Sequence, residues 1–397
     1  MPEQVAVIRK YKITNKLLAV IQFLFCLSAM VDPTNLFGTK LPLFALLIIV
    51  LTAGHHRIDS EIILKYFILL TVQCVSCCML VFANEIIDYA FTVQNVFFFM
   101  TFLLFSWSKD LDIDKAMVYS SVIISSITIF GFVTMYINPE MEAILFAFGT
   151  DESIEKCPWM MARREFLGIE LVQFFYRSSP AMIIPYTVLV NKLLYARSNK
   201  LGILFVISLM FISFVASAQR MIIGSAVLIP IILGFKKFKS SLIFRTIIAI
   251  MGLFAFIILI KAIFDTTVEE SSDVKFGHII SYVDYYFSYI PYCLFGTGPG
   301  ALFYTKGYND IVCQTEWVYL DIFKMYGIIG GSIIMSFFLY PLKCFYKHRK
   351  ENQSKSLLIG YALFLILSMQ NPFLLASTGL IAMYYAYSHI KKPVLLK

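Results

Sequence analysis

The sequence predicts an all-α polytopic integral membrane protein, built as a single transmembrane domain over residues 1–397 with about 12 transmembrane helices. Three observations carry this prediction. Of the 397 residues, 59% are apolar and only 15% are charged, whereas a soluble globular domain has about 25% charged residues. The mean hydropathy is +0.78. Several runs of about 18 residues or more carry almost no charge, which is the length that a helix needs to cross a bilayer.

The apolar runs define the predicted spans. The first follows a basic amphiphilic head and is followed at once by another span, so we interpret it as a retained helix rather than a cleaved signal peptide. The spans are residues 14–31, 36–53, 62–83, 89–107, 115–137, 177–195, 201–217, 219–235, 243–262, 316–340, 356–371 and 373–390.

The basic residues predict the orientation of these spans. If the N-terminus is cytoplasmic, most of the 33 basic residues fall in segments on that side, and the opposite short loops VDPTN and NEIIDYA hold none. This alternation is typical of the positive-inside rule. We therefore expect both termini to be cytoplasmic, and we assign the net charge of +8 to topology rather than to a nucleic-acid partner.

Two long loops fall on the opposite, outer side of the membrane. They are residues 138–176 and residues 263–315, and both contain aromatic and amphipathic segments. We expect them to be ordered and to lie against the outer membrane face. Because function is commonly carried by structured loops on a rigid scaffold, these loops are the first place to look for a site.

Several arginines lie on this outer side. Arg163 and Arg164 belong to the first long loop, Arg177 opens a span, and Arg220 lies in the hairpin ASAQRMIIG. An arginine at membrane depth is costly and usually faces a cavity or a partner, and its guanidinium matches phosphate oxygens. These residues predict an anionic ligand, with snorkelling or pairing to a structural carboxylate as the alternative.

Two residues are candidates for acid or base chemistry. Glu316 starts the span 316–340 and has no partner of opposite charge three or four residues further on, so it is a candidate general base. His278 is the one histidine that this topology places outside the cytoplasmic segments, and it is either an acid or base or a hydrogen-bonded structural residue. Asp321 and Lys324 are spaced to pair on one helical face. No cluster has metal-ligand spacing, so we predict no metal.

The outer glycine-rich stretch FGTGPG, with Gly298 and Gly300, is not a nucleotide-binding loop. It lacks the GK[ST] ending and follows no predicted strand. Its glycines suit a tight turn, and free backbone N–H groups there are an alternative contact for phosphate.

The cysteines divide into two groups. The CxxCC pattern of residues 74–78 lies mid-span and reads as small core residues rather than a metal site. Cys157, Cys293 and Cys313 are on the predicted outer side, an oxidising compartment. The sequence leaves open whether two of these three cysteines form a disulfide.

The late outer loop and the segments around it resemble the Wzy-type O-antigen polymerases and the O-antigen ligases. That superfamily has a GxGxG stretch followed by HNxxL…GxxG, and the equivalents are FGTGPG, residues 315–320 and residues 326–330. The hairpin ASAQRMIIG is similar to the family's SxSRxxxxG hairpin, which places its arginine at Arg220. The ligases have His-Asn where this chain has Thr315-Glu316, which favours a polymerase.

The resemblance implies a GT-C-like glycosyltransferase of the bacterial inner membrane that needs no metal or cofactor and whose active site faces the periplasm. It would transfer a growing glycan from undecaprenyl diphosphate to a new lipid-linked repeat unit. The expected partners are that lipid-linked oligosaccharide, membrane lipid, and a chain-length regulator and flippase of the same pathway. The alternatives are a ligase that transfers glycan to lipid A core, and a polysaccharide flippase or other transporter.

The roles that follow are expectations for individual residues. Arginines would stabilise the diphosphate leaving group, with Arg220 expected to face the catalytic base. Glu316 or His278 would accept the proton of the acceptor hydroxyl. The diphosphate set is Arg220, Arg177, Arg164 and Arg163, and the residues expected to contact glycan or present loop backbone are Gly298, Gly300, Tyr304 and Trp317.

Overall fold

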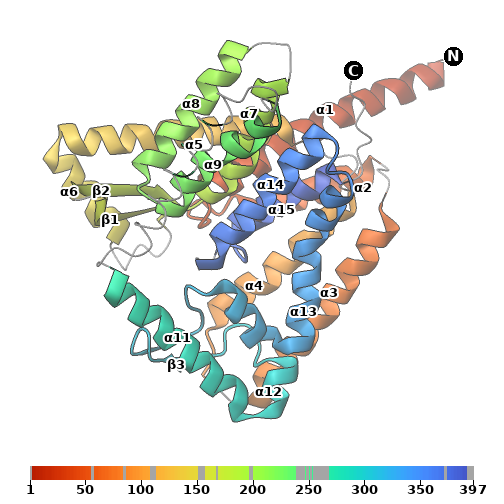
Figure 1. Cartoon of the computed structure of the whole chain (residues 1–397). Coiled ribbons are helices and arrows are strands. Elements are labelled where there is room, and N and C mark those ends of the chain that lie inside the picture. The colour runs from red at the N-terminus through yellow and green to blue at the C-terminus, as the bar shows by residue number, and fades with distance from the viewer. Residues whose placement is uncertain are drawn as a thin grey trace. The chain divides into compact units, whose positions relative to one another are not determined.

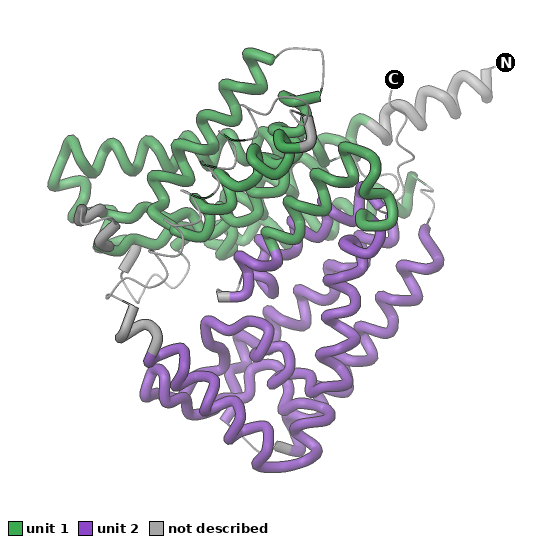
Figure 2. The backbone as a smooth tube through the Cα atoms, viewed as in Figure 1, with its two compact units in different colours: residues 1–56, 110–263, 345–364 green, residues 57–109, 264–344, 365–397 purple. Residues whose placement is uncertain are grey.

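The chain is mostly helical and divides into two compact units, coloured separately in Figure 2. Unit 1 comprises residues 1–56, 110–263 and 345–364, and unit 2 comprises residues 57–109, 264–344 and 365–397. The structure, a computed structural model, describes residues 2–54, 58–83, 86–107, 113–150, 157–166, 169–195, 200–237, 246, 250, 253, 268–370 and 373–390.

Unit 1 is built around α5, which packs against both α1 and α8 (Figure 1). The helix α7 packs on α9, and its residues from Ile183 to Asn191 are all buried. The elements of this unit are α1 Pro2–Val31, α2 Lys40–Ala53, α5 Asp114–Ile137, α6 Pro139–Thr150, β1 Trp159–Phe166, β2 Ile169–Tyr176, η3 Ser179–Met182, α7 Ile183–Tyr195, α8 Lys200–Ala216, α9 Arg220–Lys237 and most of α14 Asn352–Leu367.

Unit 2 has an aromatic core in which rings stack. The ring centroids of Phe102 and Phe337 are 5.1 Å apart, and Tyr387 lies 4.9 Å from Phe337 and 4.8 Å from Phe105. Such pairs add to the energy of apolar burial. The elements are α3 Ser60–Ala83, α4 Tyr89–Thr101, η1 Phe102–Trp107, α11 Val268–Ser288, α12 Ile290–Phe295, β3 Phe303–Thr305, β4 Asp310–Val312, α13 Val318–Lys347, which ends just beyond the unit, η4 Ser368–Gln370 and α15 Ser377–His389.

Within the described residues, four helices are long and apolar enough to cross a membrane, and they make this a membrane-embedded helical protein. They are Ser60–Phe82, Tyr89–Trp107, Asp114–Ile137 and Val318–Lys347. Other predicted spans contain shorter helices; α2 has 14 residues, or about 21 Å, against a hydrocarbon core of about 30 Å. The predicted span 243–262 lies almost entirely outside the described residues. The count of about 12 spans therefore remains a prediction from the sequence.

Two antiparallel hairpins correct the all-α prediction. In residues 138–176, α6 is followed by β1 and β2, which pair from Trp159↔Tyr176 to Phe166↔Ile169. The second strand, IELVQFFY, is rich in the β-branched and aromatic residues that favour strands. The ring of Trp159 stacks on Phe174 with centroids 5.7 Å apart, so aromatic packing stabilises a hairpin where the sequence predicted only an ordered loop. The second hairpin, β3–β4, falls in residues 263–315.

A break in α13 shapes the neighbourhood of the site. Gly327 has φ +65° and ψ −177°, which is not helical. Backbone carbonyls freed by such a break must find other donors when buried. The carbonyl of Lys324 accepts from the N–H of Thr297 at 3.0 Å, and that of Met325 accepts from the N–H of Gly298 at 3.0 Å and from the Ser76 hydroxyl at 2.6 Å. The glycine-rich stretch thus completes the hydrogen bonding of α13.

Replacing Gly327 by alanine is expected to destabilise the protein strongly. A Cβ there would lie 2.3 Å from the carbonyl carbon and oxygen of Leu294. Gly38 is a matched control, because its φ is also +65° but nothing lies within 4 Å of its Cβ position. We expect Gly38→Ala to cost roughly 1 kcal/mol for its positive φ. Gly327→Ala should cost roughly 3 kcal/mol or more, because its ψ of −177° adds a conformation that is essentially limited to glycine and because its Cβ would overlap Leu294. Equal shifts in the thermal unfolding midpoint would contradict this account of the break.

Candidate functional site

The candidate site lies in unit 2, where α11, the β3–β4 hairpin and the start of α13 meet. At its centre is Asp321, which is only 1% exposed. Its carboxylate accepts the backbone N–H of Thr315 at 3.1 Å and the hydroxyl of Tyr282, which lies 2.9 Å from the Thr315 hydroxyl. Burial, together with the nearby charge of Asp321, raises the pKa of Tyr282 well above its usual value. The phenol therefore remains a hydrogen-bond donor at neutral pH.

Lys324, one turn further along α13, is equally buried. Its Nζ donates to the carbonyl of Cys313 at 2.8 Å and to that of Ala301 at 2.5 Å, and lies 4.3 Å from the centre of the Phe303 ring. Its charge also acts on Asp321. The pair that the sequence predicted is thus coupled through charge, while the direct hydrogen bonds of each side chain hold the loop and the hairpin against α13.

Glu316 is held between two anchored neighbours. The N–H of Thr315 bonds Asp321, and the N–H of Trp317 donates to the Thr315 hydroxyl at 3.1 Å. Glu316 is half-buried and makes no hydrogen bond or ion pair with any residue that the structure describes. It lies in the loop before α13, which begins at Val318, two residues later than the predicted span. It is therefore an available carboxylate at the start of α13.

The charge of Glu316 acts on Tyr308, which lies in the turn between β3 and β4. Burial and then the charges of Glu316 and Asp321 raise the pKa of Tyr308 to about 12. The Tyr308 ring packs edge-on against His278, with centroids 4.4 Å apart. Glu316, Tyr308 and His278 therefore belong to one neighbourhood of unit 2.

His278 is enclosed. It is fully buried, and its Nδ1 lies 2.5 Å from the Thr305 hydroxyl. A Cβ on Gly307 would lie 2.5 Å from the imidazole ring, so the β3–β4 turn covers the ring. This geometry favours the structural interpretation of His278 and leaves Glu316 as the better candidate for a general base.

We expect His278 to make stability depend on pH. Burial lowers its pKa below the ordinary value of 6.5, so the folded state holds a neutral ring that the unfolded state protonates more readily. The unfolded state then binds more protons below about pH 6.5, and stability falls as the pH falls. Thermal unfolding in detergent between pH 7.5 and 5 is the measurement, and His278→Gln should flatten the profile. A His278→Gln profile as steep as that of the native protein would contradict this role.

The glycines expected to contact ligand are packed against helices. Gly298 and Gly300 have φ values of +93° and +90°, and a Cβ on them would lie 2.3 Å from Leu80 Cγ and 2.2 Å from Thr92 Oγ1. The N–H of Gly298 is occupied by the carbonyl of Met325. These observations favour a role for Gly298 and Gly300 in the turn and in packing, rather than in phosphate binding. Tyr304, by contrast, is 52% exposed, and Trp317 is half-buried.

The arginines expected at the diphosphate lie in unit 1, whereas Glu316 and His278 lie in unit 2. Arg177 follows β2 and is half-buried, and Arg220 is half-buried at the first position of α9, just after a turn with φ +47° at Ala218. Arg163 is 63% exposed and pairs with Glu142 at 3.2 Å. The side chain of Arg164 lies outside what the structure describes. The expectation that Arg220 faces Glu316 stays a prediction.

The cysteines are all free in the structure. Cys313, near the site, lies with its Sγ 3.7 Å from a carboxylate oxygen of Asp88, and burial raises its pKa to about 11. It is therefore a protonated thiol rather than a nucleophile.

Sequence reasoning missed Tyr282, Thr305 and Thr315, which form the polar frame of the site. Their residue types gave no signal of this role, because the frame forms only when α11 and the β3–β4 hairpin pack on the start of α13. Comparison with protein-family models, with curated proteins and with solved structures finds no significant match. The interpretation of the site therefore depends on its geometry and on the motif resemblance.

Proposed function

We propose that this membrane protein is a glycosyltransferase that polymerises undecaprenyl-diphosphate-linked oligosaccharide repeat units into O-antigen polysaccharide. The observation that carries the proposal is the environment of Glu316. This half-buried carboxylate has no partner in the described chain and stands between two anchored residues, at the entrance to a broken membrane helix. It also lies in the segment that resembles the superfamily motif.

The proposed reaction assigns one task to each group. A hydroxyl of the sugar at the non-reducing end of the new repeat unit attacks the anomeric carbon of the growing glycan, while the bond from that carbon to the diphosphate oxygen breaks. Glu316 accepts the hydroxyl proton. Arg220 and Arg177 stabilise the negative charge on the departing undecaprenyl diphosphate. Tyr304 and Trp317 offer aromatic faces to sugar rings. No step in this scheme requires a metal or a cofactor.

The proposal includes the finer topology predicted from the sequence. The chain would have about 12 spans in a GT-C-like arrangement in the bacterial inner membrane, with both termini cytoplasmic and the site facing the periplasm. The four apolar helices of membrane-spanning length support the membrane location, and the charge asymmetry of the loops supports the orientation. A flippase and a chain-length regulator would act on the same glycan before and during polymerisation.

Deletion of the gene, followed by electrophoresis of lipopolysaccharide, tests the proposal. We expect core lipid carrying one repeat unit and no ladder, with the ladder restored by the native gene. Core alone, with full-length glycan retained on its lipid carrier, would instead identify a ligase. An unchanged ladder would contradict both functions.

A further inference from the structure

A pocket between α3 and α13 in unit 2 lies at the end of α13 opposite the candidate site. Its volume is about 560 Å³, within the range of about 300–1,000 Å³ that is common for small-molecule sites. One face of α3, from Glu61 to Leu69, and one face of α13, from Ile333 to Lys343, form its walls. Spacings of three, four and seven residues put these side chains on single helical faces.

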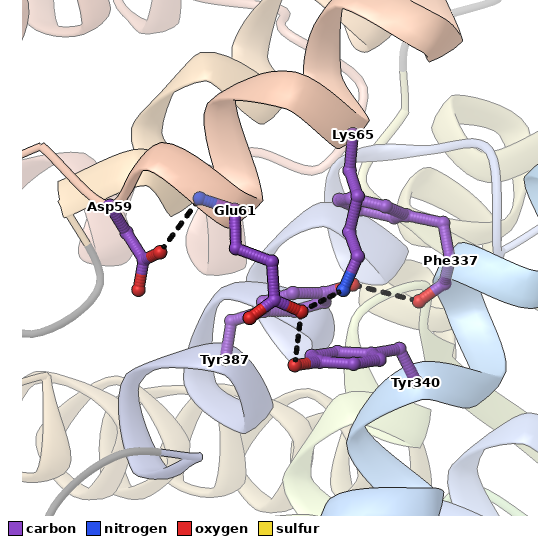
Figure 3. A network of polar contacts seen from close by, with 6 residues as sticks. All are labelled: Asp59, Glu61, Lys65, Phe337, Tyr340 and Tyr387. Carbon is purple, nitrogen blue, oxygen red and sulfur yellow. Dashed lines mark hydrogen bonds and ion pairs between the residues drawn. The ribbon is translucent and has the colours of Figure 1, made fainter.

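The polar end of the pocket is a fixed network, shown in Figure 3. The Lys65 ammonium pairs with Glu61 at 2.8 Å and lies 3.3 Å from the centre of the Tyr340 ring. The Tyr340 hydroxyl donates to the same Glu61 oxygen at 3.0 Å. The N–H of Glu61 donates to Asp59 at 3.1 Å, which holds the first turn of α3. These contacts join the N-terminal end of α3 to the C-terminal end of α13.

Among the described residues that line the pocket, one positive charge has no paired carboxylate. Glu61 and Lys65 form an ion pair, and Lys343 is the further charged group of this lining, whereas Asp59 bonds the Glu61 backbone outside it. Lys343 is exposed and has no hydrogen bond or ion pair to any residue within the described ranges. A single ammonium group complements a phosphodiester, which carries one negative charge.

The other end of the pocket is apolar. Ile68 and Leu339 are 43% and 45% exposed at its rim, and Leu69 and Phe337 are buried beneath them. Ile333 is ten residues before Lys343, or about 15 Å along the helix. Both helices are candidate membrane spans, so the charge lies at their ends and the apolar walls lie deeper in the bilayer. This order of polarity matches that of a phospholipid.

We propose that this pocket binds one anionic phospholipid, with its phosphate on Lys343 beside Lys65 and an acyl chain against Ile68 and Leu339. The inference is independent of the proposed enzymatic function, because it uses residues at the opposite end of α13. A zwitterionic lipid carries no net charge to match the pocket. Water-soluble phosphates lack the chain that would cover the exposed apolar rim.

Native mass spectrometry of the delipidated full-length protein, titrated with dioleoyl phosphatidylglycerol or dioleoyl phosphatidylcholine, tests this proposal. We expect tighter binding of phosphatidylglycerol. Lys343→Glu replaces an attraction by a repulsion, so it should weaken that binding on the order of tenfold or more, and Lys343→Arg should retain it. Lys115→Glu is the matched control, since Lys115 is also an exposed lysine at the end of a candidate span but lies outside the pocket.

A second variant tests the apolar end without changing charge. Ser336 is an exposed residue that lines the pocket, so Ser336→Phe should fill the cavity and weaken phosphatidylglycerol binding with little effect on folding. Equal affinity for the two lipids, equal losses in Lys343→Glu and Lys115→Glu, or displacement of the lipid by glycerol phosphate at similar concentration would overturn the proposal. Unchanged binding in Ser336→Phe would do the same.

Discussion

Glu316→Gln is expected to abolish long-chain polysaccharide while the protein still accumulates in the membrane. The amide keeps the size of the side chain but cannot accept the proton of the acceptor hydroxyl. Loss of a positioned general base typically costs about 10²–10⁴-fold in rate. Because Glu316 has no partner in the described chain, its replacement should leave the fold intact. The measurement is the glycan ladder of a deletion strain that carries the variant, together with immunoblotting of the membrane fraction.

Asp310→Asn is the control for this experiment, because Asp310 is an exposed carboxylate in the adjacent hairpin strand β4. It removes the same charge from the same unit and should leave the ladder unchanged.

Asp321→Asn tests folding as well as activity. Its carboxylate bonds Tyr282 and Thr315, so its loss should lower the amount of folded protein as well as activity. A normal ladder from Glu316→Gln would refute the assignment of Glu316 as the base.

Arg220→Ala should be the second large effect, with a loss of roughly 10²–10³-fold in polymerisation rate. This is the magnitude seen when one group that stabilises a developing negative charge is removed. Arg220→Lys should rescue activity poorly, because a lysine keeps the charge but loses the two-pronged contact with phosphate oxygens. Arg177→Ala should behave in the same way. The rate of ladder formation in membranes that hold equal amounts of each variant is the measurement.

Arg349→Ala serves as the matched control for the arginine series. Arg349 is exposed, and its guanidinium packs on the Tyr346 ring at 4.0 Å, on the predicted cytoplasmic side. Its loss should not change the ladder. If Arg220→Lys is fully active, the phosphate-binding role of the guanidinium fails, although a need for positive charge at that position would remain.

The sequence predicts the helical membrane class well, because several charge-free runs of spanning length in one chain are typical of a bilayer environment and rare in soluble proteins. It predicts less well how long each helix is. Residues 36–53 form an apolar run, yet the helix occupies only Lys40–Ala53, since hydropathy does not report the turn that precedes it. The β1–β2 hairpin was missed because its stability comes from cross-strand and ring contacts such as Trp159–Phe174, which hydropathy does not report.

The residues of the candidate site also fall into two groups, those that the sequence could single out and those whose roles depend on tertiary contacts. Glu316 could be singled out because it is a carboxylate without a nearby partner of opposite charge. The structural role of His278 could not be decided, because it depends on Thr305, Gly307 and Tyr308 folding over the ring. Likewise, the spacing of Asp321 and Lys324 indicated a pair. The hydrogen bonds that each makes to the loop and the hairpin arise only when α11 and the β3–β4 hairpin pack on α13.

Reconstitution of the purified protein with a lipid-linked repeat unit tests the central claim most directly. The full chain in phospholipid vesicles, supplied with undecaprenyl-diphosphate-linked repeat units and a chelator of divalent cations, should produce glycans of two or more repeats and release undecaprenyl diphosphate. One carrier should be released for each bond formed, and the Glu316→Gln protein should produce none. If the native protein is folded and the repeat units remain single, or if they only cross the vesicle membrane, the protein is not a polymerase.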